Sequence, residues 1–114
     1  MKALFTGGIK CGKSRLAEAF MLENFTHSKP YYLATAELID GEMKERIFNH
    51  KQRRKDHFIT IEEPIKLLET LKACEAPVLI ECISMWLNNG LYYGIADEAI
   101  LQELEAVLQL PADL

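Results

Sequence analysis

One short run near the start of the chain constrains its fold and chemistry more than any other feature. The residues G-G-I-K-C-G-K-S at positions 7–14 fit the pattern G-x-x-x-x-G-K-(S/T) and directly follow an apolar segment at 3–6. Residues 15–23 are good helix formers, with helical spacing between Leu16, Ala19, Phe20 and Glu23. A strand, loop and helix in this order is the context that favours a phosphate-binding loop over a glycine-rich turn that only happens to contain lysine and serine.

The residue types in this loop suit phosphate binding. Glycines allow the backbone N–H groups to form a nest around phosphate oxygens, next to the positive end of a helix. Lys13 can reach the terminal phosphates of a nucleotide, and Ser14 can ligate Mg²⁺. The loop therefore predicts a nucleotide-binding protein.

Strands and helices alternate along the rest of the chain. Aromatic and apolar runs predict strands at 31–35, 58–61 and 78–82, in addition to the one at 3–6. A polar helix is expected at 42–51, and another opens at Glu62-Glu63-Pro64 with an apolar stripe of Ile65, Leu68 and Leu71. Asp97 is the expected N-cap of a last helix ending near residue 109, whose apolar residues are Ile100, Leu101, Leu104, Val107 and Leu108. This alternation predicts an α/β fold with a mostly parallel sheet covered on both faces.

Composition excludes several classes of protein. The 114 residues suffice for one domain, although a nucleotide-binding α/β domain usually has more. A hydrophobic content of 49% and a charged content of 26% are ordinary for a globular protein, and no apolar run approaches the roughly 20 residues of a membrane span. The net charge of -4 argues against nucleic acid as a partner. The N-terminus does not resemble a signal peptide, so we expect a cytoplasmic location.

Two further groups of residues bear on chemistry. Glu81 ends the apolar run at 78–80, where an acid in a phosphate-loop enzyme lies near Mg²⁺ and the γ-phosphate, although an acid at a strand end can also be merely solvated. Basic residues gather between the second and third predicted strands, and they are either a solvated helix end or a site that binds polyphosphate. They are Arg46, His50, Lys51, Arg53, Arg54, Lys55 and His57. The three cysteines include no C-x-x-C pair, which predicts reduced thiols and no zinc site.

Taken together, these motifs closely resemble one family, the bifunctional adenosylcobinamide kinase and adenosylcobinamide-phosphate guanylyltransferase of cobalamin biosynthesis. The resemblance rests on the order and spacing of five segments and covers the chain to about residue 108. The segments are the loop at 7–15, Y-L-A-T-A at 32–36, the stretch from Glu42-Met43 through Arg46-Ile47 to His50-Lys51 and Arg54, T-I-E at 60–62, and L-I-E-C-I-S-M-W-L-N-N at 79–89.

The resemblance implies a two-step enzyme with a RecA-like P-loop core, assembled as a homotrimer. Such an enzyme phosphorylates adenosylcobinamide with ATP or GTP. It then moves GMP from GTP onto a histidine and passes it to adenosylcobinamide phosphate. His50 matches that histidine, and Ser14 and Glu81 match the metal-binding positions. The nucleotide contacts that carry over are Gly7, Gly8, Ile9, Lys10, Cys11, Gly12, Lys13, Ser14, Thr35, Ala36, Glu37, Lys51, Gln52, Arg53, Arg54, Glu62 and Glu81.

The residues around His50 suit this chemistry. A neutral imidazole nitrogen can attack the α-phosphorus, while Lys51, Arg53 and Arg54 disfavour the imidazolium form and bind the departing pyrophosphate. A different small-molecule kinase would keep Lys13 and Glu81 but would have no use for this histidine. A non-catalytic nucleotide-binding module would bind GTP without turnover.

The resemblance also implies that chains of the family continue with another strand and further helices. We therefore expect the sheet to be incomplete at its C-terminal end and the last helix to lack part of its cover. The chain is then a fragment, a truncated gene product, or a shortened version that buries this surface by association.

Overall fold

The sheet has three parallel strands that begin and end together. The computed structural model describes residues 2–7, 12–25, 27–35, 57–111 and 113–114. Within them, β1 (Tyr31–Ala34) lies between β2 (Ile59–Glu62) and β3 (Val78–Glu81). Ala34 is in register with Glu62 on one side and with Glu81 on the other. The carboxyl ends of all three strands therefore meet at one edge of the sheet.

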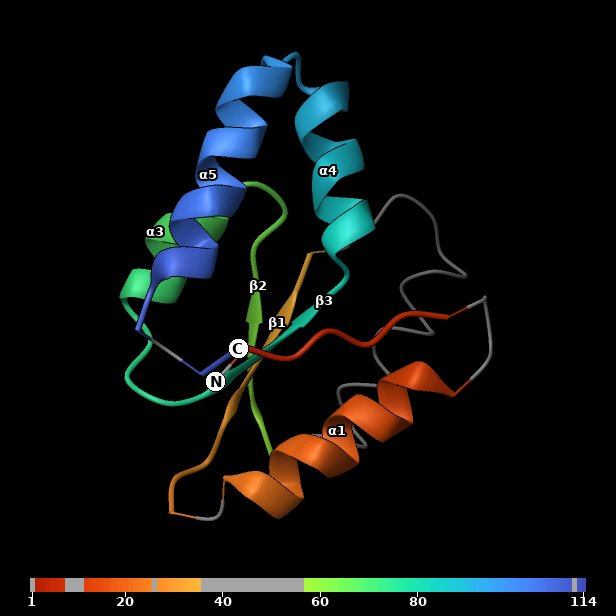
Figure 1. Cartoon of the computed structure of the whole chain (residues 1–114), viewed down its shortest axis with the longest axis vertical. Helices are drawn as coiled ribbons and strands as arrows, with labels where there is room; N and C mark the ends of the chain where they lie inside the picture. The colour runs from red at the N-terminus through yellow and green to blue at the C-terminus, as the bar shows by residue number, and fades with distance from the viewer. Residues whose placement is uncertain (1, 8–11, 26, 36–56, 112) are drawn as a thin grey trace.

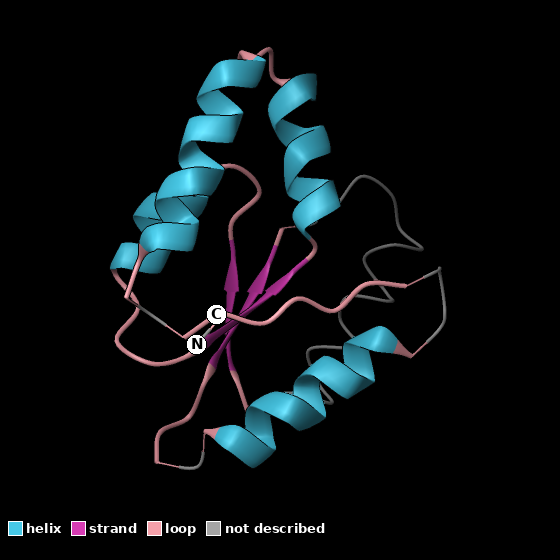
Figure 2. Ribbon diagram, viewed as in Figure 1, coloured by secondary structure: helices cyan, strands magenta, loops and turns pink. Residues whose placement is uncertain are grey.

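Helices cover both faces of this sheet. Helix α1 (Lys13–Asn24) lies against one face, and α3 (Leu67–Lys72), α4 (Ile83–Tyr92) and α5 (Asp97–Gln109) lie on the other side (Figures 1 and 2). The prediction of a parallel α/β fold covered on both faces is confirmed. No helix in the described part of the chain is long and apolar enough to cross a membrane.

Alternation along the strands divides the apolar residues into two cores. On the side of α3, α4 and α5, Leu33 and Val78 are buried with Trp86 and Ile100. On the side of α1, Tyr32 is buried together with Met21 and Phe58. Neighbouring residues of a strand point to opposite faces, so each strand contributes to both cores. The short strands are consequently rich in apolar side chains throughout, as buried parallel strands are.

The predicted strand at 3–6 is wrong. This segment is described but forms no strand, and the N–H of Ala3 donates to the carbonyl oxygen of Leu114 at 3.0 Å. The N–H of Val78, the first residue of β3, donates to the carbonyl oxygen of Asp113 at 3.0 Å. The last residues of the chain thus accept backbone hydrogen bonds from the N-terminal segment and from the start of β3. Figure 1 shows the two termini close together.

Two helix starts differ from the predictions. The helix expected from Glu62 begins at Leu67, because Glu62 belongs to β2 and the Glu63 carboxylate accepts the N–H groups of Ile65 and Lys66 at 3.1 and 3.0 Å. These bonds form a turn that precedes the helix. Helix α5 is confirmed, but its N-cap is Ala96, and Asp97 is the first helical residue.

The buried face of α1 and the whole of α4 differ from the predictions. In α1 the buried residues are Ala17 and Met21, whereas Leu16 is 63% exposed. Helix α4 was not predicted at all. The polar helix expected at 42–51 lies outside the described residues. Cys74 and Cys82 are free thiols, and Cys11 lies outside the described residues.

Candidate functional site

The N-terminus of α1 has features that favour an anion. Gly12 precedes the helix with a φ of 85°, in the left-handed region that favours glycine, and its carbonyl oxygen accepts the N–H of Leu16 at 3.1 Å. Lys13 and Ser14 form the first turn, which contains no acidic residue. The partial positive charge of the helix N-terminus and the charge of the Lys13 ammonium would therefore both attract an anion bound in front of the helix.

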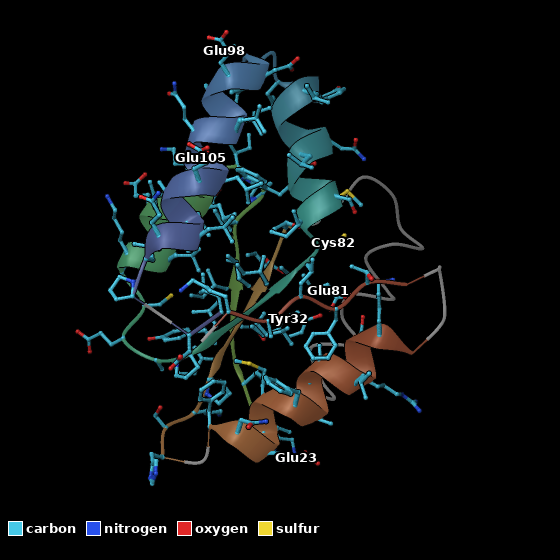
Figure 3. All side chains as sticks on the ribbon, viewed as in Figure 1. Glu23, Tyr32, Glu81, Cys82, Glu98 and Glu105 are labelled. Carbon is cyan, nitrogen blue, oxygen red and sulfur yellow. The ribbon has the colours of Figure 1, made fainter. Side chains whose placement is uncertain are left out.

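Glu81 connects this helix start to the end of β3. The Ser14 hydroxyl donates to Glu81 Oε1 at 2.7 Å, and the Tyr32 hydroxyl donates to Glu81 Oε2. Figure 3 shows Tyr32 and Glu81 on the side of the sheet that faces α1. Sequence analysis placed Ser14 and Glu81 at one site, and the structure brings these two side chains into direct contact.

A second acid lies at the same edge of the sheet. Glu62 ends β2, and the register places it and Glu81 on either side of Ala34. Residues in register across parallel strands project to the same face, so both acids and Tyr32 belong to the face covered by α1. Glu62 is exposed, whereas Glu81 is partly buried. The carboxyl ends of β2 and β3 thus each carry an acid on the face covered by α1.

Thr35 fixes the end of β1 to the end of β3. Its side chain is fully buried, and its hydroxyl accepts the N–H of Cys82 at 2.9 Å and donates to the Cys82 carbonyl oxygen at 2.7 Å. Its own N–H donates to the carbonyl oxygen of Glu81 at 2.8 Å. These bonds determine where the backbone of Glu81 lies. The nucleotide contact that the resemblance implies for Thr35 remains a prediction.

Asn89 supports the same region from α4. Its side-chain amide is buried and donates to the carbonyl oxygens of Thr35 and Pro64, at 2.8 and 3.0 Å. Sequence analysis missed this role and that of Tyr32. The signal in the sequence is only partial, because alternation puts Tyr32 and Ala34 on one face of their strand, whereas the position of Glu81 beside them follows from the register between the strands.

The remaining predicted site residues are only partly described. Gly7, Gly12, Lys13, Ser14, Thr35, Glu62 and Glu81 are described, whereas those at 8–11, 36–37 and 50–54 lie outside the described residues. His57, from the predicted basic group, is exposed in the turn before β2.

The oxygen atoms at this site suit magnesium. Mg²⁺ prefers hard oxygen ligands and is commonly held by one or two protein oxygens together with phosphates and water. The Ser14 hydroxyl and the Glu81 carboxylate, in contact at 2.7 Å, are such a pair. Within the described ranges, no cluster of three or more histidine, cysteine or acidic side chains could hold a metal. Phosphate oxygens of a bound nucleotide and water would complete the coordination of a cation held by this pair.

Comparison with known proteins identifies the family. A sequence model of the cobinamide kinase / cobinamide phosphate guanyltransferase family matches residues 3–114. The chain belongs to this family. The family predicted from the sequence motifs is thus confirmed, and members of it include several curated bacterial proteins.

Three curated proteins resemble the chain over most of its length. The bifunctional adenosylcobalamin biosynthesis protein CobP of Pseudomonas aeruginosa is 44% identical over 92 residues, which are 78% of this chain and 52% of that protein. The bifunctional adenosylcobalamin biosynthesis proteins CobU of Escherichia coli and Salmonella typhimurium are 40% and 38% identical, over 82% and 81% of this chain and 52% and 51% of theirs. The chain therefore spans about half the length of these curated relatives.

Proposed function

We propose that this chain carries the nucleotide site of a bifunctional adenosylcobinamide kinase and adenosylcobinamide-phosphate guanylyltransferase, on a RecA-like P-loop core. In the first reaction, ATP or GTP phosphorylates a hydroxyl of adenosylcobinamide. In the second, GMP from GTP is transferred to adenosylcobinamide phosphate, which gives adenosylcobinamide-GDP. Membership of the family supports this proposal. The structural observation that supports it at the level of residues is the hydrogen bond between Ser14 and Glu81.

The geometry at the end of β3 supports a metal-nucleotide site. In a phosphate-loop enzyme, the serine after the loop lysine and an acid at a strand end hold the cation that bridges the phosphates. Ser14 and Glu81 occupy these two positions and are bonded to each other. When bound, Mg²⁺ would neutralise charge on the phosphate oxygens. Lys13 would bind the same phosphates from the first turn of α1.

The transfer of GMP needs a nucleophile, and we propose His50 for this role. A nitrogen of its neutral imidazole attacks the α-phosphorus of GTP. The new N–P bond forms as the bond between the α-phosphorus and the bridging oxygen breaks, so that pyrophosphate leaves with the electron pair. An oxygen of adenosylcobinamide phosphate then attacks the same phosphorus and releases the imidazole. Lys51, Arg53 and Arg54 would stabilise the pyrophosphate, and these residues lie outside the described part of the chain.

The test is the intact mass of the protein after incubation with GTP and Mg²⁺. We expect the mass of one GMP to be added, lost in acid and stable in base, because the bond is a phosphoramidate. His50→Ala should abolish the adduct, whereas His57→Ala, a matched change at an exposed histidine, should retain it. Lys13→Ala should weaken GTP binding without unfolding the protein, because it removes a charge-assisted contact and no core packing.

Each other outcome contradicts a specific part of the proposal. An adduct that persists in His50→Ala refutes the assigned nucleophile. GTP binding with no adduct but with phosphorylation of another small molecule indicates a different kinase. GTP binding without any turnover indicates a non-catalytic module.

We also propose that copies of the chain associate, since the resemblance implies a homotrimer. Leu101 and Leu108 project from α5 with exposed fractions of 60% and 57%, while Ile100 and Val107 of the same helix are buried. Exposed leucines one above the other on a helix favour an interface. Light scattering measures the association, and a stable monomer at every concentration would contradict it.

A further inference from the structure

Tyr32 is a buried polar group that contacts the candidate site. Its side chain is 4% exposed and packs in the core on the α1 side with Met21. Its ring meets Phe58 edge to face, with the ring centroids 5.9 Å apart. Because the ring sits in a strand and in a core, the hydroxyl has little freedom to move.

The Glu81 carboxylate is held from two sides by partners of different kinds. Oε1 accepts the Ser14 hydroxyl, which lies in the first turn after the loop, and Oε2 accepts the Tyr32 hydroxyl, which lies inside the sheet. A carboxylate has about four lone-pair sites, so both bonds leave one free on each oxygen. Ser14 belongs to the element that would meet a ligand, whereas Tyr32 belongs to the scaffold.

We infer that Tyr32 is a positioning residue that orients the Glu81 carboxylate toward the cation of a metal-nucleotide complex. The inference deepens the proposed function and rests on it. Tyr32 need not touch the nucleotide or the metal, and it acts by fixing one oxygen of Glu81 so that the other keeps a constant direction beside Ser14. Partners that orient a metal-binding side chain in this way commonly change metal affinity by 10–100-fold when they are removed.

A purely structural role is the competing explanation, since a buried tyrosine hydroxyl usually needs a hydrogen-bond partner of some kind. The two explanations differ in what they predict for the metal. A structural role predicts that loss of the hydroxyl lowers stability and leaves the requirement for Mg²⁺ unchanged. A positioning role predicts that the requirement for Mg²⁺ rises whether or not stability changes.

The experiment measures binding of methylanthraniloyl-GTP to the chain, with and without Mg²⁺. Tyr32→Phe retains the ring and removes the hydroxyl. We expect the Mg²⁺ concentration that gives half-maximal enhancement of binding to rise about tenfold, and metal-free affinity to change less than twofold. The matched control is Tyr31→Phe, the same change at the preceding residue, which packs in the core on the other face of the sheet. This control should keep the Mg²⁺ dependence of the parent.

A double-mutant cycle with Glu81→Gln makes the test specific. In the Glu81→Gln background, Tyr32→Phe should have no further effect on Mg²⁺ dependence. Tyr32→Phe should fold, because Ser14 still donates to Glu81 Oε1 and the ring stays packed in its core. A further rise in the double variant, or an unchanged requirement in a folded Tyr32→Phe, would overturn the inference.

The outcomes also separate this inference from the proposed function. If the parent binds the GTP analogue in a Mg²⁺-dependent way but forms no GMP adduct, the guanylyltransferase assignment fails, and a raised requirement in Tyr32→Phe still supports the positioning role. Binding that does not respond to Mg²⁺ in the parent would overturn both.

Discussion

Replacing the buried Asn89 of α4 by leucine should lower the stability of the protein far more than the same substitution at the exposed Asn88. Its amide donates to the carbonyl oxygens of Thr35 and Pro64, at 2.8 and 3.0 Å, and the side chain is 8% exposed. Asn89→Leu keeps a similar shape but removes the donor from the buried carbonyl oxygen of Thr35 and from the partly buried one of Pro64. At about 1–2 kcal/mol for each unsatisfied carbonyl group, we expect a loss of about 2–4 kcal/mol.

That loss is measurable in a chain of this size. Total stability of a domain is typically about 5–15 kcal/mol. With an unfolding entropy of about 2.1 cal/mol/K per residue, 114 residues correspond to a fall in Tm of about 8–17 °C. Urea unfolding can be followed by the fluorescence of Trp86, the one tryptophan in the sequence, which is buried on the same helix. The midpoint should fall while the slope stays constant.

The matched control is Asn88→Leu, the same substitution at the preceding, exposed position. It should change stability by no more than about 0.5 kcal/mol. Equal losses for the two variants, or an unchanged midpoint for Asn89→Leu, would refute the argument that this amide joins α4 to the ends of the strands.

Two other predictions concern packing and pH. In Gly90→Ala, a Cβ atom would lie 2.9 Å from Ile100 Cδ1. Ile100→Val removes that methyl group and costs about 0.5–1.5 kcal/mol in the parent, so in the Gly90→Ala background it should cost less or even stabilise. Additive losses of stability in urea unfolding would contradict this. Burial raises the pKa of the Cys74 thiol in the folded protein. The stability that this shift contributes should be fully present below the unfolded-state pKa of about 8.5, and it should be lost as pH rises through the higher folded-state pKa. Urea midpoints of the parent and Cys74→Ala between pH 7 and pH 10 test this, and parallel curves would contradict it.

The sequence allowed the sheet to be predicted because its strands are apolar on both faces and are separated by helical patterns. β1, β2 and β3 lie within one or two residues of the predicted segments. Periodicity could not show that 3–6 forms no strand, because that outcome depends on bonds to Asp113 and Leu114 at the far end of the chain. Such long-range competition has no local signal.

The site was predictable where a motif fixes chemistry at one position. Ser14 and Glu81 were paired from their places after the loop and at a strand end. Tyr32 and Asn89 were missed because their contribution is a hydrogen bond across elements, and the partner is known only when the register is known. Helix α4 was missed because one residue separates it from β3 and no capping side chain marks its start.

The register of the sheet has a consequence for how the chain folds. In the part of the chain that the structure describes, both strand pairs are parallel, and β1 pairs with segments far along the sequence, Tyr31 with Ile59 and with Val78. None of these described pairings is a hairpin, and a long loop must close before the first bond between β1 and β2 is made. During synthesis, β1 leaves the ribosome with both edges unpaired and waits for β2 and then for β3. The segment most exposed to wrong pairing in that interval is the one that carries Tyr32.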